Sequence, residues 1–448
     1  MPNPTDLKTD ITRIFELQKA NAWKLKQSNP ATRKTKLMRL RDRLMQVGEE
    51  VSEALYQDMA RPKTTMPFDV QNAIDTANET IEHLDEWMAP TPVTAKSIDA
   101  EVNAYVHYEA RGVILILGPW NFPFHLCFEP LIYAIAAGNS AIVKPSELTP
   151  ATSAIVTRII RELFDESEVA VFEGGADVAT LLLDKPFDHI FMTGSPKVGK
   201  IVMAAAAKNL ASVTLELGGK NPAIIDRKAD IEKAAYQIML SRIMNAGQVC
   251  LSIDYVTVPS ESAHLLAEKM VESAKRLVYT DGRFDPAKQG RFVNRNNFDR
   301  VRRYVDEAVS LGARVILGGG SNADDLTMEP TILTDVPANA AIMHEEIFGP
   351  VLVVIPYDKL QGAIDVVRAN GKPLGSFVFS NDPAFVQDVL QQTSSGGVSV
   401  NVWGEHYFDG RLPFGGVNGS GVGRYHSIYG FREFSHERPV FTRGPKAA

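Results

Sequence analysis

VILILGP at residues 113–119 is a short apolar run that stops at a turn, and it decides how the chain around it is interpreted. Runs of the same kind recur downstream at helix-length intervals. They are Ser140–Lys144, His189–Met192 and Ser212–Leu215. Continuous apolar strands separated by helices are typical of a parallel sheet covered on both faces, so the sequence predicts an α/β fold. In such sheets ligands bind beyond the carboxyl ends of the strands, where this chain places polar residues.

A second series of strand-like runs predicts a second α/β domain that begins near Leu217. The runs are Tyr255–Val258, Ala313–Leu317, Val351–Ile355 and Ser376–Phe379. The first ninety residues or so instead carry apolar side chains at three- and four-residue steps, typical of helices. After a proline-rich break, alternating apolar positions in Val102–Glu109 indicate an extended arm. We expect one domain from residues 1–93 and 110–216, another from 217–394, an arm with C-terminal strands from 94–109 and 395–430, and a tail at 431–448.

Composition excludes several classes of protein. The chain has 448 residues, 45% of them hydrophobic and 23% charged, with a net charge of -7, so no basic surface points to nucleic acid. The N-terminus lacks the apolar core of a secretory signal, and no apolar run reaches the roughly 18 residues that a membrane span needs. Cys127 and Cys250 are the two cysteines; they can form one disulfide at most, which favours a reducing, cytoplasmic setting. Neither belongs to a Cys/His cluster with zinc-ligand spacing.

Cys250 is the most informative residue for function. It ends the stretch NAGQVC at residues 245–250, while Glu216 lies in LELGGK at 215–220 and Asn121 in GPWNFP at 118–123. A thiol, a carboxylate and an amide on loops that follow strands are suited to act as nucleophile, base and oxyanion donor. A single cysteine taken alone is more often an inert buried side chain. The Cys250 hypothesis therefore depends on the other motifs.

Three further loops have the composition of a nucleotide site. The glycines of TGSPKVG at 193–199 would let the backbone approach a pyrophosphate at a helix start, although the spacing is not G-x-G-x-x-G and such turns are usually plain connectors. Lys144 and Glu147 can each bind ribose hydroxyls, or be a solvated lysine and a glutamate favoured at a helix start. EEIFGP at 345–350 is either solvent-exposed surface or, because of its Phe-Gly-Pro, a buried loop of defined conformation.

In this order the motifs resemble the aldehyde dehydrogenase superfamily, from about Val113 to Glu433. Two later stretches, LPFGGV at 412–417 and SGVG at 420–423, resemble its C-terminal loop. The resemblance implies two α/β domains with parallel-type sheets, one a Rossmann-like NAD(P)-binding domain at 1–93 and 110–216 and the other catalytic at 217–394. It also implies a small β oligomerisation arm.

The resemblance also implies a role for each residue. Cys250 would attack an aldehyde, Asn121 and the Cys250 backbone N–H would hold the oxyanion, and Glu216 would activate water to hydrolyse the thioester left by hydride transfer to NAD(P). Glu346 and Phe348 would hold the nicotinamide ribose. The other cofactor contacts implied are Trp120, Lys144, Glu147, Gly194, Ser195, Val198 and Leu217. No metal is expected.

The short start before Asn121 resembles the class 3-like branch, which includes fatty and aromatic aldehyde dehydrogenases. That branch implies a homodimer, with an arm at roughly Ile98–Glu109 and a tail strand at Val398–Val402, and no membrane anchor is expected. Trp403, His406 and Tyr407 are candidates for an apolar substrate entrance, or equally for packing at a dimer interface. Glu147 should repel a 2′-phosphate, which favours NAD, although the resemblance implies that NADP can be accepted as well.

Two other functions remain to be weighed. A CoA- or phosphate-dependent acylating relative would have no need of Glu216 as a water-activating base. A non-catalytic structural relative would have no need of the whole set Cys250, Glu216 and Asn121. A Cys-His protease would need a histidine base, and we expect His107, His125 and His189 to be structural or exposed.

Overall fold

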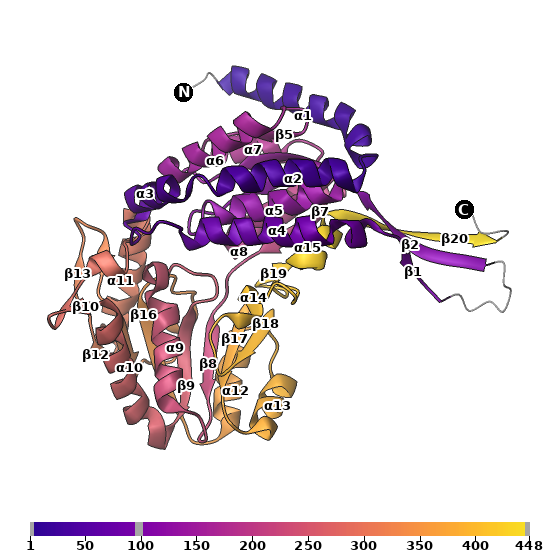
Figure 1. Ribbon diagram of the computed structural model, residues 1–448. Helices are drawn as coiled ribbons and strands as arrows, with labels where there is room; N and C mark the ends of the chain where they lie inside the picture. Colours follow the sequence, from indigo (N-terminus) through magenta and orange to yellow (C-terminus); the bar gives the residue numbers. More distant parts are fainter. Residues whose placement is uncertain (1–3, 95–101, 444–448) are drawn as a thin grey trace.

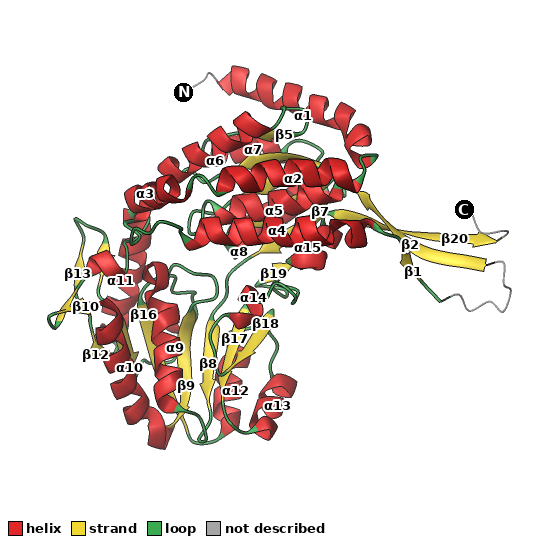
Figure 2. Ribbon diagram, in the orientation of Figure 1, coloured by secondary structure: helices red, strands yellow, loops and turns green. Residues whose placement is uncertain are grey.

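The computed structural model describes residues 4–94 and 102–443 of the chain. Two open sheets, each covered by helices, form the upper and lower parts of the molecule in the view of Figure 1, and a narrow β arm projects from their junction. Figure 2 shows helices and strands alternating in both parts. The predicted α/β class with two sheets and a β arm is confirmed.

The upper sheet has six strands in the order β19-β7-β6-β3-β4-β5. Its strands are β3 (Val113–Leu117), β4 (Ser140–Lys144), β5 (Val169–Val171), β6 (His189–Thr193), β7 (Ser212–Glu216) and β19 (Gly421–Val422). All pair in parallel except β19, which is antiparallel to β7. From β3 the chain first builds one side of the sheet and then crosses to the other with β6. A ligand crevice is expected at this switch, beyond the carboxyl ends of β3 and β6.

Helices cover both faces of the upper sheet (Figure 2). Those that follow its strands are α5 (His125–Ala137), α6 (Pro150–Leu163), α7 (Ala176–Leu183) and α8 (Pro196–Ala207). The N-terminal section forms α1 (Pro4–Lys26), α2 (Pro30–Leu44), α3 (Gly48–Met59) and α4 (Phe68–Met88). The apolar positions at helical spacing are buried as predicted, including Leu37, Leu40, Leu44 and Val47. α4 packs against α2 and α5, and Arg61 in the loop before it contacts the loop that follows β3.

The lower sheet has seven strands in the order β12-β15-β16-β9-β8-β17-β18. They are β8 (Asn221–Ile225), β9 (Ile253–Pro259), β12 (Arg314–Leu317), β15 (Thr331–Thr334), β16 (Val351–Tyr357), β17 (Gly375–Phe379) and β18 (Gly397–Val400). Only β12 runs antiparallel to its neighbour. The predicted runs all form strands. β8, which starts with Asn221-Pro222, and β15, which has four residues, were not expected.

Helices again alternate with these strands. They are α9 (Ile231–Ile243), α10 (Ala263–Val278), α11 (Arg295–Ser310), α12 (Leu360–Ala369) and α13 (Pro383–Gln392). Two short helices, α14 (Glu405–Phe408) and α15 (Ser427–Glu433), belong to the segment that returns from the lower sheet to the upper one.

The arm is a three-stranded antiparallel sheet that leaves the body of the molecule (Figure 1). Its strands are β1 (Thr91–Pro92), β2 (Val102–Ala110) and β20 (Ser435–Arg443). Residues 98–101 of the expected arm lie outside the described residues. β2 pairs with β20 along its whole length, a pairing that the sequence pattern did not reveal. The expected tail strand forms β18, which pairs in parallel with β17 in the lower sheet.

Within residues 4–94 and 102–443, none of the helices combines the length and the hydropathy that crossing a lipid bilayer needs.

Candidate active site

Cys250 follows a segment whose backbone is forced into a rare conformation. Asn245, Ala246 and Gly247 have φ angles of 50°, 54° and 72°, so three successive residues lie in the left-handed region. That region costs energy for residues with a side chain. At Gly247 a Cβ atom would lie 2.2 Å from the carbonyl oxygen of Gly349, so the close approach admits only glycine. The chain thus stores strain directly before the thiol, a common property of functional sites.

Side chains hold this segment in place. Gln248 is fully buried, and its Nε2 donates to the carbonyl oxygens of Asn245 and Arg291, each at 3.0 Å. The Nδ2 of Asn221 donates to the Cys250 carbonyl oxygen at 2.7 Å. Trp403 donates its indole N–H to the carbonyl oxygen of Leu251 at 2.9 Å. The peptide on either side of the thiol is therefore fixed by groups from three other parts of the chain.

Asn121 lies in the loop after β3 and packs against the Cys250 loop. Its side chain is 4% exposed, and its Nδ2 donates to the carbonyl oxygen of Gln248 at 3.1 Å. Asn245 Nδ2 donates to the carbonyl oxygens of Asn121 and Gln248, at 3.0 Å and 3.3 Å. The amide predicted as an oxyanion donor is therefore held by the carbonyl group of Gln248, which lies two residues before Cys250 in the sequence.

Glu216 ends β7 with its side chain 3% exposed, and its Oε1 atom is buried with no hydrogen-bond partner in the described part of the chain. Burial raises the pKa of this carboxyl well above its usual value. Arg424 opposes the shift, whereas the negative charges of Glu129 and Glu433 add to it. A buried carboxylate with a raised pKa and a free oxygen is suited to take a proton from water.

Cys250 is partly buried, and burial raises the pKa of its thiol to about 12, with further contributions from Glu216 and Glu346. The backbone N–H groups of Cys250 and Leu251 act in the opposite direction, because they would hydrogen-bond to the thiolate. Both carboxylates are therefore within electrostatic reach of the sulfur. The structure brings together the thiol, the carboxylate and the amide that the sequence singled out.

Glu346 belongs to the loop at residues 345–350 and faces Gly218. A Cβ atom at Gly218 would lie 2.1 Å from the Glu346 carboxylate, so the glycine lets this carboxylate lie close to the backbone. Burial and the charge of Asp254 raise the pKa of Glu346 to about 8, opposed by a hydrogen bond from the Gly219 backbone. Phe348 has a φ of 47°, and its ring meets that of Trp120 edge to face at 5.3 Å. The EEIFGP segment is therefore a shaped loop at the site.

The residues predicted for the adenosine side line the same sheet edge. Lys144 Nζ donates to Glu147 Oε2 at 2.9 Å, so the two side chains form an ion pair. Ser195 caps the N-terminus of α8, accepting from the Val198 N–H at 3.4 Å, and Val198 is 43% exposed. Leu217 is buried and packs against Gly199 of α8.

These residues fit a dinucleotide. Thr193 Oγ1 is buried at the end of β6 without a hydrogen-bond partner in the described ranges, beside Gly194 and the N-terminus of α8. A helix start of this kind attracts phosphate. In residues 4–94 and 102–443, no three His, Cys, Asp or Glu side chains are grouped so as to hold a metal ion.

The three entrance candidates occupy different environments. Trp403 is buried beneath the Cys250 loop, and His406 is buried against Ser399, whose Oγ lies 2.7 Å from its Nδ1; burial lowers the pKa of His406 to about 4. Tyr407 alone of the three is half-buried, with its hydroxyl 3.1 Å from Nε2 of His125. The structure does not bring Trp403 and His406 to an open surface.

A buried charged cluster beside Tyr407 was missed by sequence reasoning. Glu129 lies between two histidines, with carboxylate oxygens 2.7 Å from His125 Nε2 and 3.2 Å from His426 Nε2. Asn72 Nδ2 lies 2.7 Å from the same nitrogen of His125. The signal was present in part, because His125 and Glu129 are four residues apart on α5 and so share one face. His426 lies three hundred residues away, and no local pattern joins it to them.

Known proteins share this architecture over nearly the whole chain. The Aldehyde dehydrogenase family matches residues 4–440. AldX of Bacillus subtilis is 44% identical over 97% of this chain and 98% of its own, and the coniferyl aldehyde dehydrogenase of Pseudomonas sp. is 39% identical over 94% and 88%. Aldehyde dehydrogenase family 3 member A2 of Rattus norvegicus is 36% identical over 91% and 83%.

Solved structures of aldehyde dehydrogenases have the same fold over nearly the whole chain. Staphylococcus aureus AldH in a substrate-bound state superimposes with a TM-score of 0.92 at 35% identity, covering 98% of this chain and 95% of that one. An aldehyde dehydrogenase of Mycobacterium tuberculosis complexed with NAD+ gives 0.88 at 26% identity, covering 100% and 92%. The predicted resemblance is confirmed, and its named relatives include class 3 enzymes. With the site geometry, these matches establish that the chain belongs to the aldehyde dehydrogenase family of NAD(P)-dependent oxidoreductases.

Proposed function

We propose that the protein oxidises an aldehyde to the carboxylic acid through a covalent intermediate on Cys250. The observation that carries the proposal is the convergence of Cys250, Asn121 and Glu216 at the carboxyl edge of the upper sheet. The Cys250 sulfur, as thiolate, adds to the carbonyl carbon and forms a thiohemiacetal. The Asn121 amide and the Cys250 backbone N–H stabilise the negative charge that develops on the carbonyl oxygen.

NAD(P)+, when bound, would supply the acceptor for the hydride that the thiohemiacetal carbon loses. That loss leaves a thioester on Cys250. Glu216 takes a proton from a water molecule, whose oxygen adds to the thioester carbon; the sulfur then leaves as thiolate and the acid is released. The free Oε1 atom and raised pKa of Glu216 support this role.

For the cofactor we propose NAD, with NADP as a weaker alternative. Lys144 and Glu147 would exchange their mutual ion pair for the adenosine ribose, and the Glu147 carboxylate would repel a 2′-phosphate. Thr193, Gly194 and the start of α8 would face the pyrophosphate. Trp120, Val198 and Leu217 would supply apolar contacts, and Glu346 with Phe348 would hold the nicotinamide ribose. The NAD+ complex of the Mycobacterium tuberculosis enzyme supports the binding of a nicotinamide dinucleotide, and the preference for NAD over NADP rests on Glu147.

The substrate class we propose is apolar: medium- or long-chain aliphatic aldehydes, or aromatic ones. Phe68 and Phe408 are 38% and 42% exposed, and the Phe68 ring meets Phe122, Phe408 and His125, each at 5.8 Å. With Tyr407 they form an aromatic rim close to the Cys250 loop. The coniferyl aldehyde dehydrogenase among the relatives acts, by its name, on an aromatic aldehyde.

We further propose that residues 1–93 and 110–216 bind the cofactor, that 217–394 form the catalytic domain, and that the arm makes a homodimer. The arm carries exposed apolar side chains, Val93 and Phe441, at 51% and 64%. β18 ends the lower sheet and offers an edge for pairing. A single species of twice the chain mass in light scattering would support the dimer.

An acylating reaction with CoA or phosphate is the second candidate, and Glu216 argues against it. A panel of aldehydes with NAD and NADP side by side tests both, with NADH or NADPH absorbance as the readout. We expect turnover without CoA or phosphate and none with a folded Cys250→Ala variant. Parent-rate oxidation by that variant would refute the mechanism, and turnover that requires CoA or phosphate would favour the acylating reaction. Tight NAD binding without any turnover would instead indicate a structural relative.

A further inference from the structure

Arg61 joins the two loops of the site from outside them. It follows α3 in the chain, and its side chain is 12% exposed. Its guanidinium Nη2 donates to the backbone carbonyl oxygen of Asn121, and its Nε donates to the Asn245 side-chain oxygen at 3.0 Å. One planar group therefore contacts the residue that carries the oxyanion amide and the strained segment that precedes Cys250.

The orientation of the guanidinium is itself fixed. Its Nη1 lies 2.6 Å from the carboxylate of Asp69, in the first turn of α4, and Asp69 is fully buried. The Arg61 Cζ atom lies 4.6 Å from the centre of the Phe122 ring. Arginine suits this position because its donors lie on three nitrogens in a rigid plane and reach three separated acceptors, whereas the three donors of a lysine share one nitrogen.

The Asn121 side chain can stabilise an oxyanion only if its backbone is held at the right distance from the thiol. Asn121 and Asn245 belong to loops of different sheets, and the contacts among Arg61, Asn121 and Asn245 cross between them. A displacement of about 1 Å at a reacting centre can reduce a rate about a hundredfold. A rigid contact between the two loops should therefore affect the rate of the first chemical step directly.

We propose that Arg61 is a positioning residue for the oxyanion site: through its contacts with the Asn121 backbone and the Asn245 side chain, it holds the Asn121 amide where it can donate to the carbonyl oxygen of the aldehyde that Cys250 attacks. Asp69 orients Arg61. The inference rests on the proposed role of Asn121 in aldehyde oxidation and assigns to Arg61 no contact with substrate.

The test is Arg61→Lys, which keeps the charge and loses the planar fork. We expect the first-turnover burst of NADH to slow by about tenfold or more, since loss of a whole oxyanion donor costs about 10²–10³ in rate. The rate of Cys250 alkylation by iodoacetamide should stay at the parent value, because alkylation needs no oxyanion donor. Asp69→Asn should also slow the burst, but by less than Arg61→Lys does. Arg158→Lys, which alters an exposed ion pair with Glu50 on α3, is the matched control and should leave the burst unchanged.

A double-mutant cycle decides whether Arg61 acts through Asn121. In an Asn121→Ala background the position of this backbone no longer matters to the oxyanion, so adding Arg61→Lys should cause little further slowing. Equal slowing in both backgrounds, or a parent-rate burst in Arg61→Lys, would overturn the proposal. A parent protein without any burst would instead refute the proposed function, so the two failures are distinguishable. Circular dichroism and NAD binding establish that each variant is folded.

Discussion

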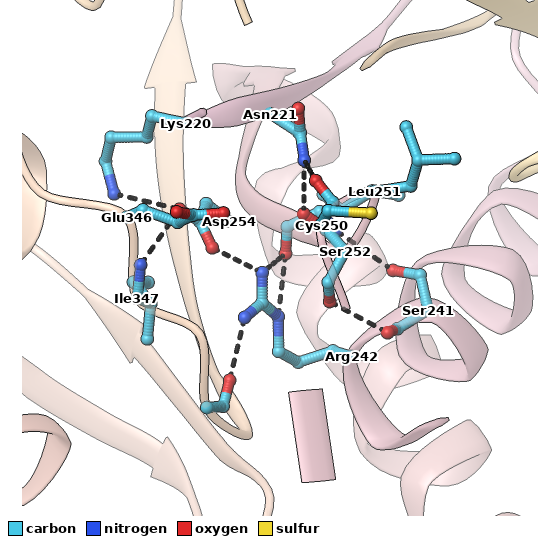
Figure 3. Close-up of polar contacts among 12 residues, drawn as sticks. Lys220, Asn221, Ser241, Arg242, Cys250, Leu251, Ser252, Asp254, Glu346 and Ile347 are labelled. Atoms are coloured by element: carbon cyan, nitrogen blue, oxygen red, sulfur yellow. Dashed lines mark hydrogen bonds and ion pairs between the residues drawn. The ribbon is translucent and has the colours of Figure 1, made fainter. Parts of the chain in front are cut away.

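The guanidinium of Arg242 lies 2.6 Å from the carboxylate of Asp254, and both side chains are almost wholly buried (Figure 3). Arg242 also donates to the Gly349 carbonyl oxygen at 2.7 Å, and Asp254 accepts from the Ile347 N–H at 3.1 Å. Lys220 lies 3.6 Å from the same carboxylate. The pair thus joins the end of α9 and the start of β9, which flank the Cys250 loop, to the loop that carries Glu346.

Asp254→Asn removes the only negative charge in direct contact with Arg242 and Lys220 in the described part of the chain. Two buried cations then lack a counter-charge, and we expect the free energy of unfolding to fall by about 3–5 kcal/mol. Urea denaturation followed by tryptophan fluorescence measures the loss. Asp306→Asn is the control, because its pair with Arg302 lies on the surface of α11 and should contribute less than about 0.5 kcal/mol. Similar losses in the two variants would contradict a special role for the buried pair.

Glu216→Gln should separate the two halves of the reaction. The amide cannot take a proton from water, but hydride transfer precedes that step, so we expect a rapid burst of about one NADH per subunit. Steady-state turnover should then fall by about 10²–10⁴. Stopped-flow absorbance records both phases, with Cys250→Ala as the variant that gives no burst. If Glu216→Gln also lost the burst, Glu216 would have to act before hydride transfer.

Glu346 makes stability depend on pH. Its folded-state pKa is about 8, raised mainly by burial and then by Asp254, whereas the ordinary value is 4.5. A carboxyl whose pKa is raised on folding contributes stability that is fully present below the ordinary value and is lost as the pH rises through the folded value. The parent protein should therefore lose stability between about pH 5 and pH 8 through this group.

Glu346→Gln removes that titration. Because Glu346 keeps some contact with solvent, we expect only a moderate effect. The Tm of Glu346→Gln should exceed that of the parent by about 2 °C at pH 9, and by less at pH 5. Thermal unfolding by circular dichroism at fixed heating rate measures both. Glu345→Gln changes the exposed neighbour and should show no such divergence. A parent and a Glu346→Gln variant whose Tm values run parallel from pH 5 to pH 9 would disprove the assignment.

The fold was predictable where the apolar pattern of the sequence was unambiguous. β3, β4, β6 and β7 are apolar runs that end at polar turns, so both their existence and their parallel orientation followed from the sequence. β8 was not, because Pro222 disfavours a strand and its pairing with β9 and β17 outweighs that preference. The pairing of β2 with β20 joins segments at opposite ends of the chain, and no local pattern specifies such a partner.

The residues of the candidate site also differ in whether the sequence alone could reveal them. Cys250, Glu216 and Asn121 stand in short motifs whose residue types suit the chemistry, so each could be named from its own neighbourhood. Arg61 could not, because its meaning depends on contacts with residues 60 and 184 positions away. His125 was expected to be structural or exposed; it is buried, and only the fold shows that it shares Glu129 with His426.

The Glu129 cluster should affect the proton affinity of the base. The titratable groups that face Glu129 are His125 and Tyr133 of α5, Glu79 of α4, Glu216 of β7, and Tyr407, Tyr425 and His426 of the C-terminal segment. The two histidines hold the pKa of Glu129 below its usual value against the effect of burial, so the carboxylate is charged at neutral pH. Burial lowers the pKa of His426, whereas the charge of Glu129 raises it.

Glu129→Gln removes a negative charge that raises the pKa of Glu216, while Arg424 and Glu433 still face that residue. The pKa of Glu216 should therefore fall, and the base should be deprotonated at lower pH. We expect the rise of thioester hydrolysis with pH, measured by rapid quench after the NADH burst, to move toward lower pH. Glu129→Asp keeps the charge and should retain the parent profile, which separates electrostatics from packing. A profile in Glu129→Gln that coincides with the parent, or one displaced toward higher pH, would show that the charge of Glu129 does not act on Glu216.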